Sequence, residues 1–350
     1  MIEWSLARQI ARFAAGAGDS LPLHADLPAF VAEAEPHLRR YTGLEPATPI
    51  PAPEAVGRPD WAEINVDSMA TLLAPVADRL GDKFDGAGPL SGPLRTAAGG
   101  IVAAELGLVV GYMSQRVLGQ YELSLVQPDE TPRLLFVAPN IAGAIRNLDI
   151  DRDSFVGWIV LHELTHVFQF SGVPWLRPHL GELLREYLAS VEVRVERPGK
   201  GGLPALPDVS KLVESFREGG LIALVQSPEQ RSIMDRLQSV MCVIEGYSEH
   251  VMDAVGAEVL PEYAGLREAM SRRRRNRSAP ERILQRLMGL DMKMRQYELG
   301  KQFCDAVAER HGVALLNRVW DRPEAVPSAA ELADPDAWAT RMGGGSAAAA

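Results

Sequence analysis

One short stretch of this chain has residue types at a spacing that can bind a catalytic metal ion. Residues 155–170 contain the pattern His-Glu-x-x-His, formed by His162, Glu163 and His166, and no other charged residue lies within the stretch. On a helix both imidazoles point the same way, so they can bind one zinc ion while Glu163 lies beside them. Glu163 could then accept a proton from a water that the metal holds. This predicts hydrolysis without a covalent intermediate.

A catalytic zinc site also needs a third protein ligand and an open position. Downstream, an apolar helical segment carries Glu245, Glu249 and Asp253 at intervals of one turn. We expect Glu245 to bind the metal and Glu249 to accept the second ring N–H of a ligand histidine, because Gly246 leaves space beside the metal. In the alternative frame Glu249 is the ligand and Asp253 supports it.

Four further residues have side chains that could serve such a site, but their neighbours in the sequence support these roles less strongly. Glu186 is an alternative third ligand, although its charged neighbours are typical of the solvent face of an amphipathic helix. A peptidase also needs a hydrogen-bond donor for the oxyanion of its transition state. Tyr297, Arg295 and His250 are possible donors of this kind, and the sequence does not choose among them.

The motifs resemble those of a known family. A His-Glu-x-x-His helix followed by a distant Glu is the gluzincin pattern, and Glu245-Gly-Tyr-Ser-Glu249 is similar to the segment that carries the third ligand in aminopeptidase-like gluzincins. The chain most closely resembles the Zincin_2 (DUF2342) family of zinc-dependent metallopeptidases, in the branch associated with coenzyme F420 biosynthesis. The segments that carry this resemblance are 117–121, 136–141, 161–170, 172–177, 245–253 and 290–297.

The resemblance implies a zinc metallopeptidase with His162, His166 and Glu245 as ligands and Glu163 as general base. The chain departs from the family at one point. The family usually has Glu-Gly-His-Ala-Asp where this chain has Tyr247, Ser248 and Glu249, so a role for the family's histidine does not carry over.

The elements that must position these residues are mostly helical. Hydrophobic spacing predicts helices over about 3–16, 26–40, 60–82, 90–118, 153–170, 177–197, 208–224, 229–256, 262–276, 280–310 and 312–320. Two β-like runs at 121–126 and 133–138 predict a hairpin, and the proline-rich residues 46–59 predict an extended connection. The hairpin could hold an extended peptide substrate along its edge, or it could only pack against the catalytic helix.

We therefore expect a mainly α fold: one zincin-like domain over 1–342, with a small β-hairpin or sheet beside the active-site helix. Residues 1–118 would form a helical N-terminal part, 119–256 the metal-site core and 257–342 C-terminal helices. Residues 343–350 are predicted to be a disordered tail.

Composition narrows the expected partners. The chain has 350 residues, of which 47% are hydrophobic, and its net charge of −10 disfavours nucleic acid and anionic membranes as partners. Cys242 and Cys304 lie in apolar helical contexts and are predicted to be two buried thiols. Because the N-terminal residues lack the continuous apolar run of a signal peptide, the expected compartment is the cytoplasm.

Two functions from different classes fit these patterns. The first is a zinc-dependent hydrolase, expected to be a metallopeptidase, that cleaves a peptide or small amide. The second is a non-proteolytic zincin-fold protein with a binding or regulatory role in an F420-related pathway, for which a protein partner is possible. Glu163 favours the enzyme, because a purely structural zinc site needs no general base.

Overall fold

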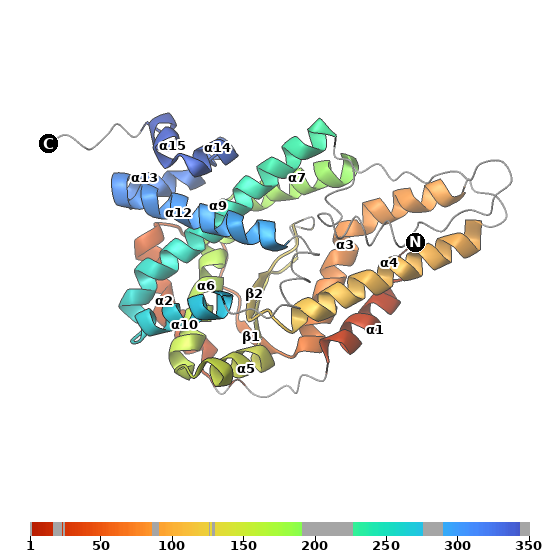
Figure 1. Ribbon diagram of the computed structural model, residues 1–350, viewed down its shortest axis with the longest axis horizontal. Helices are drawn as coiled ribbons and strands as arrows, with labels where there is room; N and C mark the ends of the chain where they lie inside the picture. The colour runs from red at the N-terminus through yellow and green to blue at the C-terminus, as the bar shows by residue number, and fades with distance from the viewer. Residues whose placement is uncertain are drawn as a thin grey trace. The chain divides into compact units, whose positions relative to one another are not determined.

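The computed structural model describes residues 2–16, 23, 25–85, 91–125, 127, 130–190, 227–275 and 290–343 (Figure 1). These residues form a mainly helical structure with one three-stranded sheet, so the predicted fold class is confirmed. The predicted helix over 208–224 and, apart from residue 343, the predicted tail lie outside the described residues. Contacts divide the chain into two compact units: Met1–Gly181 with Val251–Ala269, and Glu182–His250 with Met270–Ala350.

Three helices at the start of the first unit pack closely together: α1 (Trp4–Ala15), α3 (Arg58–Asp85) and α4 (Ser91–Ser114). Ala7 of α1 is completely buried, and a Cβ on Gly107 of α4 would lie 2.7 Å from its carbonyl oxygen. Small side chains therefore let α1 and α4 approach each other. One window of α4, Arg95–Ser114, is long and apolar enough to cross a membrane by length and composition alone, and 28% of it is buried.

The sheet consists of β1 (Pro53–Val56), β2 (Gly119–Glu122) and β3 (Arg133–Val137) in the order β1-β3-β2. β2 pairs antiparallel with β3, which confirms the predicted hairpin, although its first strand covers Gly119–Glu122 and not the expected 121–126. β1 pairs parallel with β3. Because β3 is the central strand, its residues 134–137 are completely buried. β2 pairs with β3 on one side only, and that leaves its other edge available to α6.

The helix that carries the His-Glu-x-x-His motif is α6 (Arg152–Gly172), which follows α5 (Ala138–Leu148). Asp151 caps α6 by accepting a hydrogen bond from the Ser154 backbone N–H at 2.8 Å, and hydrogen bonds from Ser154 hold the pKa of Asp151 below its ordinary value. α6 packs against α2 (Leu27–Thr42) as well as against β2. It is therefore buried along most of its length, as its apolar sequence predicts.

The second unit is also built from long helices. Three helices have residues in both units: α7 (Leu176–Ser190), α9 (Pro228–Val259) and α10 (Tyr263–Arg275). In the second unit α12 (Leu290–His311) contacts three short C-terminal helices: α13 (Val313–Asn317), α14 (Ala329–Ala333) and α15 (Pro335–Arg341). Two short elements follow α13 in the chain, η3 (Arg318–Trp320), which contacts α13, and η4 (Pro323–Ala325), which contacts η3.

Glycine governs the crossing of α9 and α12. A Cβ on Gly300 would lie 2.0 Å from the carbonyl oxygen of Cys242, and one on Gly246 would lie 2.2 Å from the carbonyl carbon of Gly300. Only glycine allows backbones to approach this closely. Cys242 and Cys304 are both free and buried there, which confirms the prediction of two buried thiols. Burial raises the pKa of Cys242 to about 11.

Candidate metal centre

The two histidines of α6 direct the same ring atom toward one point. Nε2 of His162 and Nε2 of His166 lie 3.3 Å apart, and the two rings are nearly perpendicular at 86°. Two nitrogens bound tetrahedrally to one zinc ion, each about 2.0–2.1 Å from it, lie roughly 3.3–3.4 Å apart. The observed separation fits a single metal ion.

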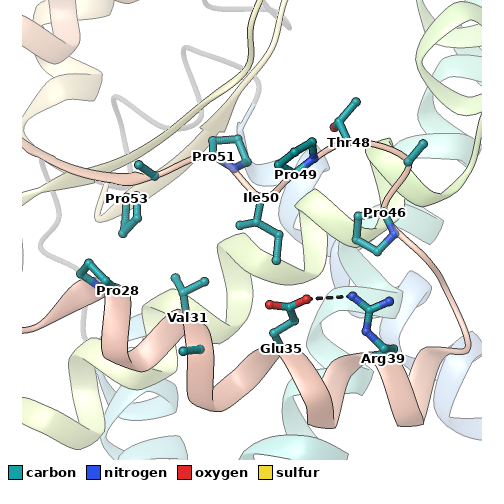
Figure 2. Close-up of a pocket in the computed structure, with 13 residues that line it drawn as sticks. Pro28, Val31, Glu35, Arg39, Pro46, Thr48, Pro49, Ile50, Pro51 and Pro53 are labelled. Carbon is teal, nitrogen blue, oxygen red and sulfur yellow. Dashed lines mark hydrogen bonds and ion pairs between the residues drawn. The ribbon is translucent and has the colours of Figure 1, made fainter.

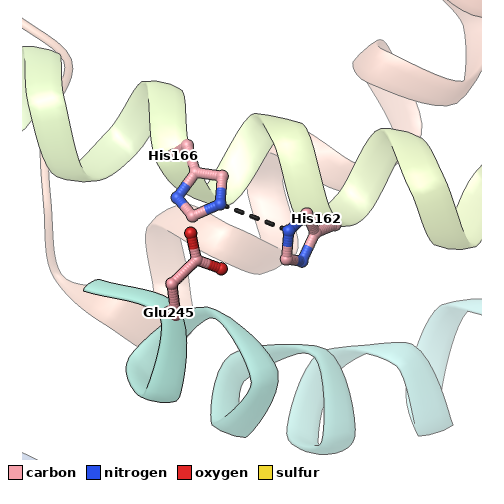
Figure 3. Close-up of side chains that lie close together, drawn as sticks. All are labelled: His162, His166 and Glu245. Atoms are coloured by element: carbon pink, nitrogen blue, oxygen red, sulfur yellow. Dashed lines mark hydrogen bonds between the residues drawn. The ribbon is translucent and has the colours of Figure 1, made fainter. Parts of the chain in front are cut away.

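Glu245 of α9 supplies the third potential ligand. The ligand atoms of His162, His166 and Glu245 all lie within 4.8 Å of one another, and Figure 3 shows the Glu245 carboxylate directed toward the two imidazoles. Glu186, by contrast, lies 3.6 Å from Arg236 in an ion pair. Of the three acids weighed as third ligand, Glu245 is the one found with the histidines, and two nitrogens with one carboxylate are donors that zinc accepts.

The remaining ring nitrogens have different partners. Nδ1 of His166 lies 2.9 Å from Oε1 of Gln169, a completely buried side chain on the same helix. Nδ1 of His162 lies 3.1 Å from the sulfur of Met252, which belongs to the part of α9 within the first unit. We did not predict either partner from the sequence. Gln169 could have been identified as a partner of His166 from its position three residues later, on the same helical face.

Glu163 contacts strand β2 through its carboxylate. The backbone N–H of Tyr121 donates to Oε2 of Glu163 at 3.0 Å. Val137 N–H donates to the Leu118 carbonyl at 2.8 Å, so the antiparallel alternation directs the N–H of Tyr121 away from β3. The Glu163 carboxylate, which is 6% exposed, is therefore held by the unpaired edge of β2.

Gly119 makes this contact possible. A Cβ at this position would lie 2.7 Å from Cγ and 2.8 Å from Oε1 of Glu163. Any other residue would push against the carboxylate. Of the two roles considered for the hairpin, packing against the catalytic helix is visible here, since the strand edge contacts Glu163 directly.

Aromatic side chains border the same region. The ring of Tyr121 lies 6.3 Å from that of Phe170, which follows His166 by one turn of α6. Burial raises the pKa of Tyr121. Arg177 holds the chain beyond β2 by donating to the carbonyl oxygens of Ser124 at 2.8 Å and Gln127 at 3.0 Å. These contacts fix the strand that orients Glu163.

Two of the acids and bases proposed around the ligands have other partners. Asp253 accepts a hydrogen bond from the Tyr263 hydroxyl and pairs with Arg267 at 2.6 Å, so it connects α9 to α10. His250 lies 2.8 Å from Asp305 of α12. Glu249 is partly buried one turn after Glu245. Arg295 and Tyr297 lie on α12, but their side chains are outside the described part of the chain.

One reason given for choosing Glu245 was wrong. Gly246 was expected to leave space beside the metal, but a Cβ there would meet the backbone of Gly300 in α12. Tyr247, which replaces the family's usual histidine, is completely buried and donates from its hydroxyl to Asn317 at 2.8 Å. Gly246 and Tyr247 therefore pack α9 within the second unit.

A separate pocket of about 640 Å³ lies between α2 and the proline-rich residues 46–53 (Figure 2). It is lined by apolar side chains such as Val31 and Ile50, with the Glu35–Arg39 ion pair of 2.7 Å at one end. None of the three candidate ligands lines it. Figure 2 shows the proline-rich segment running across from α2, and this segment is joined to the end of α6 by a hydrogen bond from Ala47 N–H to the Ser171 carbonyl at 3.1 Å.

Comparisons with known proteins agree with this arrangement. A family model described as a zincin-like metallopeptidase matches residues 2–339. A protein of Chloroflexus aurantiacus, provisionally described as a hydrolase with a novel fold, has a similar crystal structure. It is 30% identical in sequence, with a TM-score of 0.71, over 98% of this chain and 99% of that protein. No curated protein matches the chain.

Proposed function

Because the chain belongs to the zincin-like metallopeptidase family, we propose that it is a zinc-dependent hydrolase that cleaves a peptide or small amide bond. One observation carries the proposal. Two imidazole nitrogens and a carboxylate face a common point, while Glu163, the acid next to His162 in the sequence, is held by a hydrogen bond from the Tyr121 N–H. A ligand set with a separate, oriented carboxylate is what metal-assisted hydrolysis requires.

Each residue has a distinct task in this proposal. His162, His166 and Glu245 would hold the zinc ion, which when bound polarises the substrate carbonyl and acidifies water. Glu163 takes a proton from the attacking water and returns it to the leaving nitrogen. The hydrogen bond from the Tyr121 N–H to Oε2 orients the Glu163 carboxylate for this role.

The main alternative is a zincin-fold protein with a binding or regulatory role and no turnover. The hydrogen bond that orients Glu163 argues against this alternative, because a purely structural metal site does not need a base. We further propose a cytoplasmic location, with which the two free, buried thiols are consistent.

The test compares the wild type with Glu163→Gln, a variant of the same shape that cannot accept a proton. We expect both proteins to bind zinc equally, and we expect turnover to fall by about 100-fold or more in the variant. Zinc content is measured by elemental analysis, and cleavage with a mixed library of peptides. His162→Ala should lose zinc, which serves as the control for the ligand set.

The outcomes separate the two functions. Cleavage by the wild type alone, with zinc in both proteins, would support a peptidase and report its specificity. Zinc in both with no cleavage of peptides or small amides by either would favour the binding role. A wild type that takes up no zinc after reconstitution would rule out the metal centre itself.

A further inference from the structure

Gln169 is placed to control which nitrogen of His166 carries the proton. Its Oε1 lies 2.9 Å from Nδ1 of His166, and an amide oxygen can only accept a hydrogen bond. Nδ1 of His166 must therefore be the donor in this contact and carry the proton. Because neutral imidazole has one N–H, Nε2 of His166 is then unprotonated, and this is the atom that faces Nε2 of His162 at 3.3 Å.

The burial of Gln169 makes this contact hard to replace. The side chain has no solvent exposure, so water has no access to act as an alternative acceptor. Nδ1 of His162, by contrast, lies 3.1 Å from the sulfur of Met252, which is a weaker acceptor than an amide oxygen. The two histidines of the motif are thus oriented unequally.

We propose that Gln169 is a positioning residue that fixes the Nδ1–H tautomer of His166 and so forms the metal site before metal arrives. This inference rests on the proposed function, since it assigns a residue to the same site. Outer contacts of this kind typically change metal affinity by about 10- to 100-fold.

Three variants on α6 test the proposal. Gln169→Leu removes the acceptor at similar volume, and Gln169→Glu keeps an acceptor at the same reach. Thr165→Val is the matched control, because Thr165 is also completely buried and its hydroxyl bonds only to the Leu161 carbonyl, at 2.7 Å, among the contacts described for it. It removes a buried hydrogen bond next to His166 without touching the ring.

Two measurements are made on each protein. Zinc affinity is measured by competition with a chelator. Protonation of the ring nitrogens is measured in the metal-free protein by NMR of ¹⁵N-labelled histidine, and the His166 signals are assigned by their loss in His166→Asn. We expect Gln169→Leu to bind zinc about 10- to 100-fold more weakly and to lose the Nδ1–H tautomer. Gln169→Glu should restore both properties, and Thr165→Val should change neither.

Several results would overturn the proposal. Wild-type zinc affinity in Gln169→Leu would do so, as would equal weakening by Gln169→Leu and Thr165→Val, which would indicate general packing. Neither measurement requires a substrate, so an inactive wild type would count against the proposed hydrolase alone. If the wild type bound no zinc, the proposed function would fail, and the tautomer measurement would still decide the role of Gln169.

Discussion

Glycine brings two pairs of elements together in this protein, with opposite consequences. At Gly119 of β2 the nearest atoms to an added Cβ belong to the Glu163 side chain, whereas at Gly300 of α12 they belong to the backbone of Cys242 in α9. A side-chain end can move aside, but the backbone of a buried helix cannot. The first contact therefore positions a reactive group, and the second contact packs two helices.

The largest effect should come from Gly300→Ala. The new methyl group would lie 2.0 Å from the Cys242 carbonyl oxygen, so the helices must separate. We expect the free energy of unfolding to fall by about 3 kcal/mol, as in other overpacked cores. Denaturant unfolding measures this change. Gly265→Ala in α10 is the control, since a Cβ there meets nothing within 4 Å; equal loss in both variants would contradict the packing role.

Gly119→Ala should instead remove activity and spare stability. The added methyl group displaces the Glu163 carboxylate, and misplacing a catalytic group by about 1 Å can reduce turnover roughly 100-fold. We expect zinc content to be unchanged and the free energy of unfolding to fall by less than about 1 kcal/mol. If Gly119→Ala kept wild-type turnover, the contact of Gly119 would not position Glu163. If it unfolded as readily as Gly300→Ala, the contact would serve packing, like that of Gly300.

Acid should weaken the α9–α12 contact through Asp305. Burial alone would raise the pKa of Asp305, but hydrogen bonds from His250 and Lys301 outweigh burial and hold it below its ordinary value of 3.8. The stabilisation is therefore complete above that value and is lost as the pH falls further.

Measurements of unfolding free energy against pH check this expectation. The wild type should lose more stability below about pH 4 than Asp305→Asn does, by up to about 1 kcal/mol, because the carboxylate is partly exposed. Parallel curves for the two proteins would show that the Asp305 pair does not stabilise the contact.

The smallest effect is expected for Glu54→Gln. Arg133 donates to Glu54 at 3.0 and 2.6 Å across β1 and β3, and this hydrogen bonding holds the pKa of Glu54 low. Both side chains are substantially exposed, so the loss should be below about 1 kcal/mol by thermal unfolding, with turnover unchanged. A clear fall in turnover would mean that the sheet transmits strain from β1 to Glu163.

The metal ligands of α6 could be predicted because their geometry is local. Residues four apart on a helix share a face whatever surrounds them, so His162 and His166 converge as their spacing implies. The residues that surround α9 could not be predicted from local spacing. Which face of that helix meets α12 depends on partners distant in sequence, and for that reason the role assigned to Gly246 was wrong.

The sheet shows a similar limit. The β2–β3 hairpin was predicted from two neighbouring runs, but β1 was not, because it pairs with a strand far along the chain and follows several prolines. Proline is compatible with the first residue of an edge strand, where Pro53 lies. α5 was also missed, although Pro139 in its first turn is a common start of a helix.

The pairing of β2 with β3 has a consequence for chain length. Gly119 lies opposite Phe136, and β3 cannot slide because its residues 134–137 are completely buried. Inserting or deleting one residue within β2 would turn its side chains to the other face of the sheet and bring a side chain other than glycine against Glu163. Residues added or lost between Gln127 and Arg133 would leave the pairing, and the Arg177 contacts with Ser124 and Gln127, unchanged. Evolution can therefore vary the length of this hairpin at its turn, while the strand itself must keep its count of residues.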